Sequence, residues 1–160
     1  MQYITVYSIM TESARIPWLH LVIGVVVLPL FIYAVWRQGV RTKLLGVIAA
    51  ALLWDGIIFP CSWHMSNAHN EAQNLLRSGN CQVVEGPVEQ FVPMPYGGHS
   101  EESFNVKGVH FEYSDFDDSK PGFNKSESHG GPIHKGMWVR LNYHDGSILK
   151  IEVPKDKAAK

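Results

Sequence analysis

The hydrophobic residues of this chain follow two different patterns. Residues 16–36 and 44–60 are almost continuously apolar, and together they contain a single charged side chain, Asp55. From Cys81 onward, apolar and polar residues alternate. About 20 consecutive apolar residues can cross a bilayer as a helix, whereas alternation is typical of a β-strand with one buried face. The pattern therefore predicts an α+β protein, with a helical hairpin in residues 1–61 and a β domain in residues 80–154.

The two apolar runs predict a transmembrane hairpin with spans at about 16–36 and 44–62. Residues 22–31 show no polar stripe at helical spacing, although two helices buried in a water-soluble bundle would show one. The connecting loop 37–43 carries three basic residues, which favour the cytoplasmic side of a membrane. We therefore expect an integral membrane protein with two spans in the lipid bilayer, which in a bacterium would be the inner membrane. Its loop 37–43 would be cytoplasmic, and both termini would be extracytoplasmic, with a periplasmic β domain.

Two polar side chains lie inside the predicted spans, Asp55 and His20. An ionised carboxylate inside a span costs ~2.5–3.5 kcal/mol, so Asp55 should face protein or water. In an antiparallel hairpin, His20 would lie about five residues, or ~7 Å, along the axis from Asp55. Asp55 would then order the hairpin or pair with another subunit. A proton relay, in a transport or sensing subunit, is the alternative.

A shorter helix is expected after the second span, over residues 62–79. Arg77 suits the last helical turn, and Gly79 suits the position just after the helix. The polar face carries asparagines and Glu71 instead of the lysines and arginines of a membrane-surface helix. We therefore expect this helix to pack on the domain that follows. Its apolar face consists of Met65, Ala68, Ala72, Leu75 and Leu76.

Residues 80–154 contain about five expected strands, and a short charged tail follows at 155–160. The strand at 81–92 is interrupted at Gly86–Pro87, which indicates a bulge or a sheet edge because proline cannot donate to the ladder. This number of strands favours a small antiparallel β-barrel, OB-like or SH3-like in strand order. A two-residue turn at Lys107–Gly108 and a three-residue turn at 145–147 would keep apolar residues on one face. The expected pairs are Val106 with Val109, Phe104 with Phe111, Tyr143 with Leu149, and Leu141 with Ile151.

Several segments, VEGPVEQF, GHSEESFNVKGVHFEYSD, SHGGPI and VRLNY, resemble a domain found in an uncharacterised family of bacterial membrane proteins. The resemblance covers about residues 83–153. It implies that this segment is a genuine domain, and that the turns at Gly97–Gly98 and Gly130–Gly131 are part of its fold. It implies no activity.

Overall composition excludes some classes of protein. The formal net charge is −1, which argues against a nucleic-acid partner because such a protein needs a basic face. The two cysteines, Cys61 and Cys81, are too few for a disulfide scaffold. A continuous helix between them would hold their Cα atoms ~25 Å apart, far beyond the reach of a disulfide, so we expect free, buried thiols.

The eight histidines make a metal site worth testing. The best candidate ligands are His99, His129 and His134, with Glu101 or Glu102, because three or four such groups must converge on a metal. No HExxH or CxxC pair supports this site. Histidines in β loops are more often exposed to solvent or hydrogen-bonded to the backbone.

Catalytic motifs are also missing from the sequence. It contains no P-loop and no dinucleotide fingerprint, and the GHSEE segment lacks the second glycine of a nucleophile elbow. We therefore expect a non-enzymatic membrane protein, without a cofactor, that presents its barrel to an envelope protein or to a second copy of itself. A metal-dependent enzyme is the alternative. The expected binding loops contain Tyr96, Gly97, Gly98, Phe123, Gly130 and Gly131.

Overall fold

The computed structural model describes residues 2–12, 29, 30, 33, 37, 46, 48, 56, 59–98, 100–117 and 120–155. The chain divides into two units. One unit combines Met1–Glu12 with Ala68–Lys160, and the other consists of Ser13–Asn67. The predicted spans fall almost entirely outside the described residues, as do Asp55 and His20. The description below concerns the first unit.

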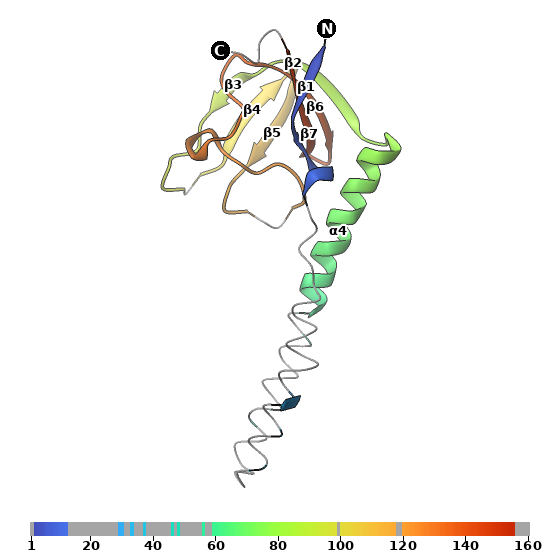
Figure 1. Ribbon diagram of the computed structural model, residues 1–160. Coiled ribbons are helices and arrows are strands. Elements are labelled where there is room, and N and C mark those ends of the chain that lie inside the picture. Colours follow the sequence, from blue (N-terminus) through green and yellow to red (C-terminus); the bar gives the residue numbers. More distant parts are fainter. Residues whose placement is uncertain are drawn as a thin grey trace. The chain divides into compact units, whose positions relative to one another are not determined.

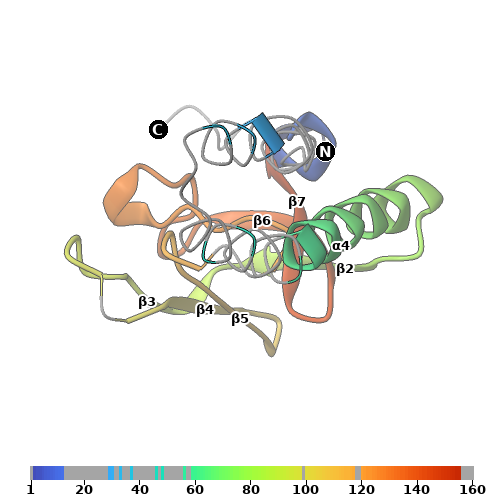
Figure 2. The ribbon, with the colours of Figure 1, turned by 90° about the horizontal axis from the view of Figure 1, so that it is seen from below.

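Two antiparallel sheets form this unit (Figure 1). The four-stranded sheet has the order β1-β7-β6-β2, and the three-stranded sheet has the order β3-β4-β5. Figure 2 shows β3, β4 and β5 together on one side of β6. The strands are β1 (Tyr3–Ser8), β2 (Gln82–Pro87), β3 (Glu89–Val92), β4 (Glu102–Val106), β5 (Val109–Tyr113), β6 (Trp138–His144) and β7 (Ser147–Pro154). The helices are η1 (Ile9–Thr11), η4 (Glu127–His129) and α4 (Phe59–Ser78).

The main hydrophobic core lies between the inner faces of the two sheets. In β4, Glu102, Phe104 and Val106 are buried, and the two residues between them are half-buried. This is the alternation that the sequence pattern predicts. Phe104 stacks on Phe111 across the β4–β5 pair, with ring centroids 5.4 Å apart. The remaining buried members of this core are Val84, Val88, Val106, Tyr113, Phe123, Ile133, Val139, Leu141, Ile148 and Ile151.

The chain passes from one sheet to the other at Val88. Its N–H donates to the Met137 carbonyl at 2.8 Å, and its carbonyl accepts from the Gly136 N–H at 2.9 Å. Val88 therefore keeps both backbone bonds outside the ladders, while β2 pairs with β6 and β3 pairs with β4. The predicted interruption at Gly86–Pro87 thus lies one residue further along. β2 is an edge strand, as its proline requires.

The two predicted hairpins have different outcomes. Phe104 pairs with Phe111 and Val106 with Val109, as predicted. In the last hairpin Leu141 pairs with Ile151 as predicted, but Tyr143 pairs with Ile148 and not with Leu149. The turn has two residues, Asp145 and Gly146, both with positive φ. A bulge between the Tyr143 and Asn142 pairs shifts the register by one residue, so that Leu141 again lies opposite Ile151. The predicted three-residue turn is therefore wrong. A two-residue turn alone would pair apolar with polar residues, but the bulge brings the apolar residues of the two strands opposite each other again.

The N-terminal strand β1 was not predicted from the sequence. It runs antiparallel to β7, with Ile4 opposite Val153 and Tyr7 opposite Ile151 (Figure 1). Its β-branched and aromatic residues suit a strand, but six residues next to a long apolar run carry a weak signal. The segment before residue 13 therefore belongs to the β domain.

Helix α4 ends as its sequence predicts. Gly79 has φ +74°, the Asn80 N–H donates to the Leu75 carbonyl at 3.1 Å, and the Gly79 N–H donates to the Leu76 carbonyl at 3.4 Å. These bonds form a Schellman motif. Ala72, Leu75 and Leu76 pack in a second small core with Ile9 and Leu149, so the end of the helix covers this domain, as predicted. Cys61 and Cys81 are free, but Cys61 is exposed where a buried thiol was expected.

The predicted architecture needs two corrections. No helix within the described residues is long and apolar enough to cross a membrane. The 20-residue helix α4 is long enough, but histidines, asparagines and Glu71 interrupt its apolar positions. The prediction of an integral inner-membrane protein with two spans, and of a function that depends on them, is therefore overturned. The closed five-stranded barrel is wrong as well, because the break at Val88 and the additional strand β1 produce two open sheets.

Candidate functional site: a carboxylate-lined cavity beside β5

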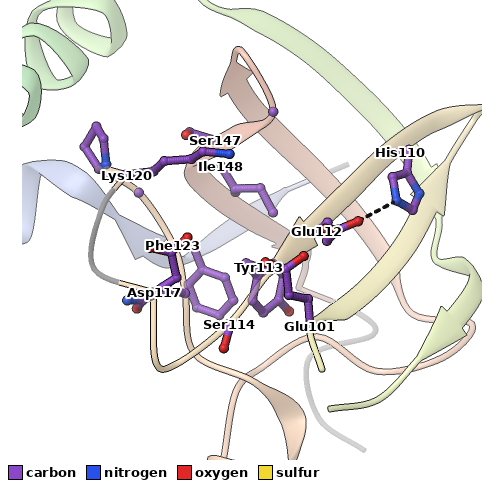
Figure 3. Close-up of a pocket in the computed structure, with 14 residues that line it drawn as sticks. Glu101, His110, Glu112, Tyr113, Ser114, Asp117, Lys120, Phe123, Ser147 and Ile148 are labelled. Carbon is purple, nitrogen blue, oxygen red and sulfur yellow. Dashed lines mark hydrogen bonds and ion pairs between the residues drawn. The ribbon is translucent and has the colours of Figure 1, made fainter. Parts of the chain in front are cut away.

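A cavity of about 260 Å³ opens beside the outer strand of the three-stranded sheet (Figure 3). Its walls come from β5, the loop after β5, and the turn that leads into β7. Tyr113, Phe123 and Ile148 form its apolar part. Its ionisable side chains are Glu101, His110, Glu112, Asp117 and Lys120.

Strand alternation places part of this set. His110 and Glu112 are two residues apart on β5, so both point away from the core and are exposed. The Nε2 atom of His110 lies 3.4 Å from Oε2 of Glu112 (Figure 3). Tyr113 points the other way and is buried, so one strand supplies both an acidic and an aromatic wall.

The opposite wall is attached to β7 through Gly122. The Phe123 N–H donates to the Ile148 carbonyl at 2.8 Å, which holds the loop close to the strand. Gly122 has φ +128°, and a Cβ atom there would lie 2.8 Å from the Ile148 oxygen. Only glycine tolerates this backbone conformation and this close approach. The loop is therefore held against β7, with Phe123 lining the cavity.

Charge at the cavity is predominantly negative. Among the described residues that line it are three carboxylates and one ammonium group, that of Lys120. Carboxylates are acceptors only, and charge-assisted bonds to them are about twice as strong as neutral ones. The arrangement suits a ligand that brings several N–H donors and a positive charge.

A second polar cluster fastens the loop next to this cavity. Asp115 accepts hydrogen bonds from the Ser126 hydroxyl, from the Ser126 N–H at 2.9 Å and from Nδ1 of His129 at 2.8 Å. Burial alone would raise the pKa of Asp115, but the bonds from Ser126 and then from His129 outweigh it and hold the pKa below its usual value. The cluster thus ties η4 to the end of β5.

This Ser–His–Asp set is not a catalytic triad. Ser126 Oγ lies 3.1 Å from Nδ1 of His129, the same nitrogen that contacts Asp115. A catalytic serine instead contacts the other ring nitrogen, and its oxygen must be open to substrate. Ser126 is fully buried, so the three residues support the loop and do not form a nucleophile.

The acid response of this cluster can be predicted. Because the folded-state pKa of Asp115 is lowered, its stabilisation is complete above its unfolded-state pKa of ~3.9 and is lost as the pH falls through the folded-state value. We expect Asp115→Asn to lower the free energy of unfolding at pH 7 by about 1–3 kcal/mol, with a smaller difference from wild type at pH 3. Urea denaturation at both pH values measures this. An equal loss at pH 3 and pH 7 would contradict the assignment.

Two of the predicted binding loops meet at His129. The Tyr96 ring lies 4.6 Å from the imidazole, and the Phe116 ring lies 6.1 Å from it on an edge. A Cβ atom at Gly98 would lie 2.8 Å from the Phe116 ring, so Gly98 allows its loop to approach the segment that follows β5. Tyr96 and Phe116 remain largely exposed.

Two of the three predicted metal-ligating histidines lie in the described part of the chain, and each contacts a different carboxylate. His134 contacts Glu127 at 2.7 Å, His129 contacts Asp115, and His99 lies outside the described residues. Within the part of the chain that the structure describes, no group of three or more histidine, cysteine, aspartate or glutamate side chains could hold a metal ion. Glu101 and Glu102 also separate, because Glu101 is exposed at the cavity and Glu102 is fully buried. The described residues therefore give the metal-dependent enzyme no support.

Sequence reasoning missed most of the cavity. It named Glu101 only as a metal ligand and Phe123 only as a loop residue. The alternation along β5 could have placed His110 and Glu112 on the solvent face. Nothing local predicts that Asp117 and Lys120 would join them. No protein-family model, no curated protein and no solved structure matches this chain.

Proposed function

We propose that this domain binds a small organic cation, an alkyl amine or a guanidine, in the cavity beside β5. The observation that carries the proposal is the excess of carboxylates over ammonium groups around one partly apolar cavity. Glu101, Glu112 and Asp117 come from three different parts of the backbone, so their convergence comes from the fold.

Two kinds of contact would hold the ligand. The carboxylates would accept hydrogen bonds from its charged nitrogen, and Tyr113, Phe123 and Ile148 would contact its carbon chain. A cavity of about 260 Å³ is slightly smaller than the ~300–1,000 Å³ of typical ligand pockets, which favours a short chain. Agmatine, with a guanidinium group and an ammonium group on four carbons, is a suitable probe.

The test is calorimetric titration of the full-length protein with agmatine. Changing Glu112 to glutamine removes one charge and keeps the shape of the side chain, and we expect binding about ten- to a hundredfold weaker, since a charge-assisted bond contributes ~1.5–3 kcal/mol. Lys120→Met removes the repelling ammonium group and should strengthen binding. Glu89→Gln, on the exposed side of β3, is the matched control and should leave binding unchanged.

Specificity separates this proposal from general attraction to an acidic surface. Butylurea has a similar chain with a neutral head group, and it should bind at least tenfold more weakly than agmatine. The proposal is overturned if wild type does not bind agmatine at millimolar concentration. It is also overturned if Glu112→Gln and Glu89→Gln weaken binding equally.

A further inference from the structure

A row of hydrogen-bonded side chains crosses the exposed face of the three-stranded sheet and ends at the cation site. It begins at Gln90 on β3, continues through Asn105 on β4 and reaches His110 on β5. Asn105 and His110 are opposite each other in the β4–β5 pair, so the strand register places their side chains on one face. His110 and Glu112 both line the cavity (Figure 3). The cation site is therefore connected to all three strands of this sheet.

This row of bonds determines which ring nitrogen of His110 carries the proton of the neutral imidazole. The Asn105 side-chain nitrogen donates to the Gln90 side-chain oxygen, and the Asn105 side-chain oxygen lies 2.7 Å from Nδ1 of His110. An amide oxygen can only accept a hydrogen bond, so Nδ1 must be the donor. The neutral ring is therefore protonated at Nδ1, and its lone pair is on Nε2.

The lone pair of His110 faces a carboxylate. Nε2 lies 3.4 Å from Oε2 of Glu112, and both atoms are acceptors while the ring is neutral (Figure 3). A proton on Nε2 turns this contact into a charge-assisted ion pair. Histidine is the side chain that gains or loses its charge between pH 5 and 8. Both side chains are more than half exposed, so this proton can exchange with solvent.

Other charged groups lie around His110 on the neighbouring elements. They are Glu101, Asp117 and Lys120 at the cavity, Glu89 on β3, and Lys107 in the turn before β5. Among the described residues, Glu112 is the carboxylate within ion-pair distance of the imidazole. A proton on Nε2 therefore acts chiefly on Glu112, which is also a proposed contact of the ligand.

We infer that His110 makes the cation site pH-dependent, because its Nε2 proton and the ligand compete for Glu112. The inference rests on the proposed cation site and adds its regulation. When Nε2 is protonated, the imidazolium pairs with Glu112 and repels a second cation. When Nε2 has released its proton to the buffer, Glu112 is available to the charged nitrogen of the ligand. By linkage, a bound ligand weakens proton binding at Nε2 by the same factor.

Calorimetric titration of the full-length protein with agmatine at pH 8 and pH 5.5 tests the competition. Wild type should bind about two- to fivefold more weakly at pH 5.5, which is the range expected for an exposed ion pair. His110→Gln keeps a donor for Asn105 but cannot take up a proton, so it should bind nearly equally at the two pH values. His134→Gln is the matched control and should keep the pH dependence of wild type, because His134 contacts Glu127 and does not line this cavity.

Proton counting gives a readout that a purely structural histidine would not give. Agmatine titrations at pH 6.5, in two buffers with different ionisation enthalpies, measure how many protons leave the protein on binding. Wild type and His134→Gln should release a measurable fraction of one proton for each ligand bound. His110→Gln should release none, because the competing proton is absent.

The tautomer of His110 can be tested without a ligand. Nitrogen-15 NMR of the full-length protein at pH 8 should show the ring protonated at Nδ1. Asn105→Leu removes the acceptor and should abolish this preference.

Three results would overturn the inference while leaving the cation site intact. They are a ring protonated at Nε2 in wild type at pH 8, equal agmatine affinity of wild type at both pH values, and a pH dependence that His110→Gln retains. Absence of agmatine binding at pH 8 would instead overturn the cation site, and this inference with it.

Discussion

Replacing Gly131 by alanine is expected to destabilise the domain by about 3 kcal/mol or more. A Cβ atom at this position would lie 2.1 Å from the Lys125 carbonyl oxygen and 2.7 Å from the Ser126 carbonyl group. These are backbone atoms, so no rotamer change relieves the overlap. The Gly131 N–H also donates to the Ser126 carbonyl at 2.7 Å, a bond that a shift of the loop would break.

The glycine pair in the other loop supplies a matched control. A Cβ atom at Gly97 would have no neighbour within 4 Å, and Gly97 does not have a positive φ. Gly97→Ala should therefore change the free energy of unfolding by no more than about 0.5 kcal/mol. Thermal and urea denaturation of both variants tests the contrast. Similar midpoints for the two variants would contradict the close packing at Gly131.

Replacing Glu102 by alanine is the second substitution with a large expected effect. This side chain is fully buried, and its two oxygens accept from the Tyr113 hydroxyl at 2.6 Å and from the Glu127 N–H at 2.9 Å. Alanine leaves both donors without an acceptor and opens a void between β4 and η4. Each unsatisfied buried donor costs about 1–3 kcal/mol, so we expect a loss of about 3 kcal/mol.

A double-mutant cycle separates the two bonds of Glu102. Tyr113→Phe alone should cost about 1 kcal/mol, and the same change in the Glu102→Ala background should cost less, because the bond is already lost. Glu89→Ala, at an exposed carboxylate on β3, should lie within about 0.5 kcal/mol of wild type. Additive losses in the cycle would show that the two side chains do not interact.

Local predictions succeeded where a short stretch of chain contains the whole cause. The Lys107–Gly108 turn sets the pairs in the β4–β5 hairpin, and Gly79 ends α4 with the expected motif. In both cases the interacting residues are within eleven positions of each other. The last hairpin shows the limit, because the bulge beside Tyr143 changes the register and has no signature in the sequence.

Predictions over longer distances failed for a related reason. β1 pairs with β7, more than a hundred residues away in the sequence. The continuous apolar run next to β1 led to the prediction that all of residues 1–61 form a helical hairpin. The predicted barrel had about five strands in residues 80–154, where the structure has six, and the sequence could not say which edges would pair. The break at Val88 decides this, since it sends β2 and β3 to different sheets.

The candidate sites divide in the same way. The sequence predicted that the loops with Tyr96 and Phe123 would carry function; in the structure Tyr96 contacts His129, and Phe123 lines the cavity beside β5. It could not show that Glu101, Glu112 and Asp117 converge while Glu102 is buried. Neighbouring glutamates look identical in a sequence, and only their strand position decides which one is solvated.

The sequence alone determined the periodicity of this domain: which residues alternate in strands, where α4 stops, and which turn joins β4 to β5. Side-chain spacing and glycine conformation act over a few residues, so a short window contains all the information. The tertiary structure decided that two open sheets form, that the first strand pairs with the last, and that carboxylates from separate segments gather around one cavity. These outcomes depend on which strands and side chains, distant in the sequence, are buried against each other. A short stretch of sequence does not contain that information.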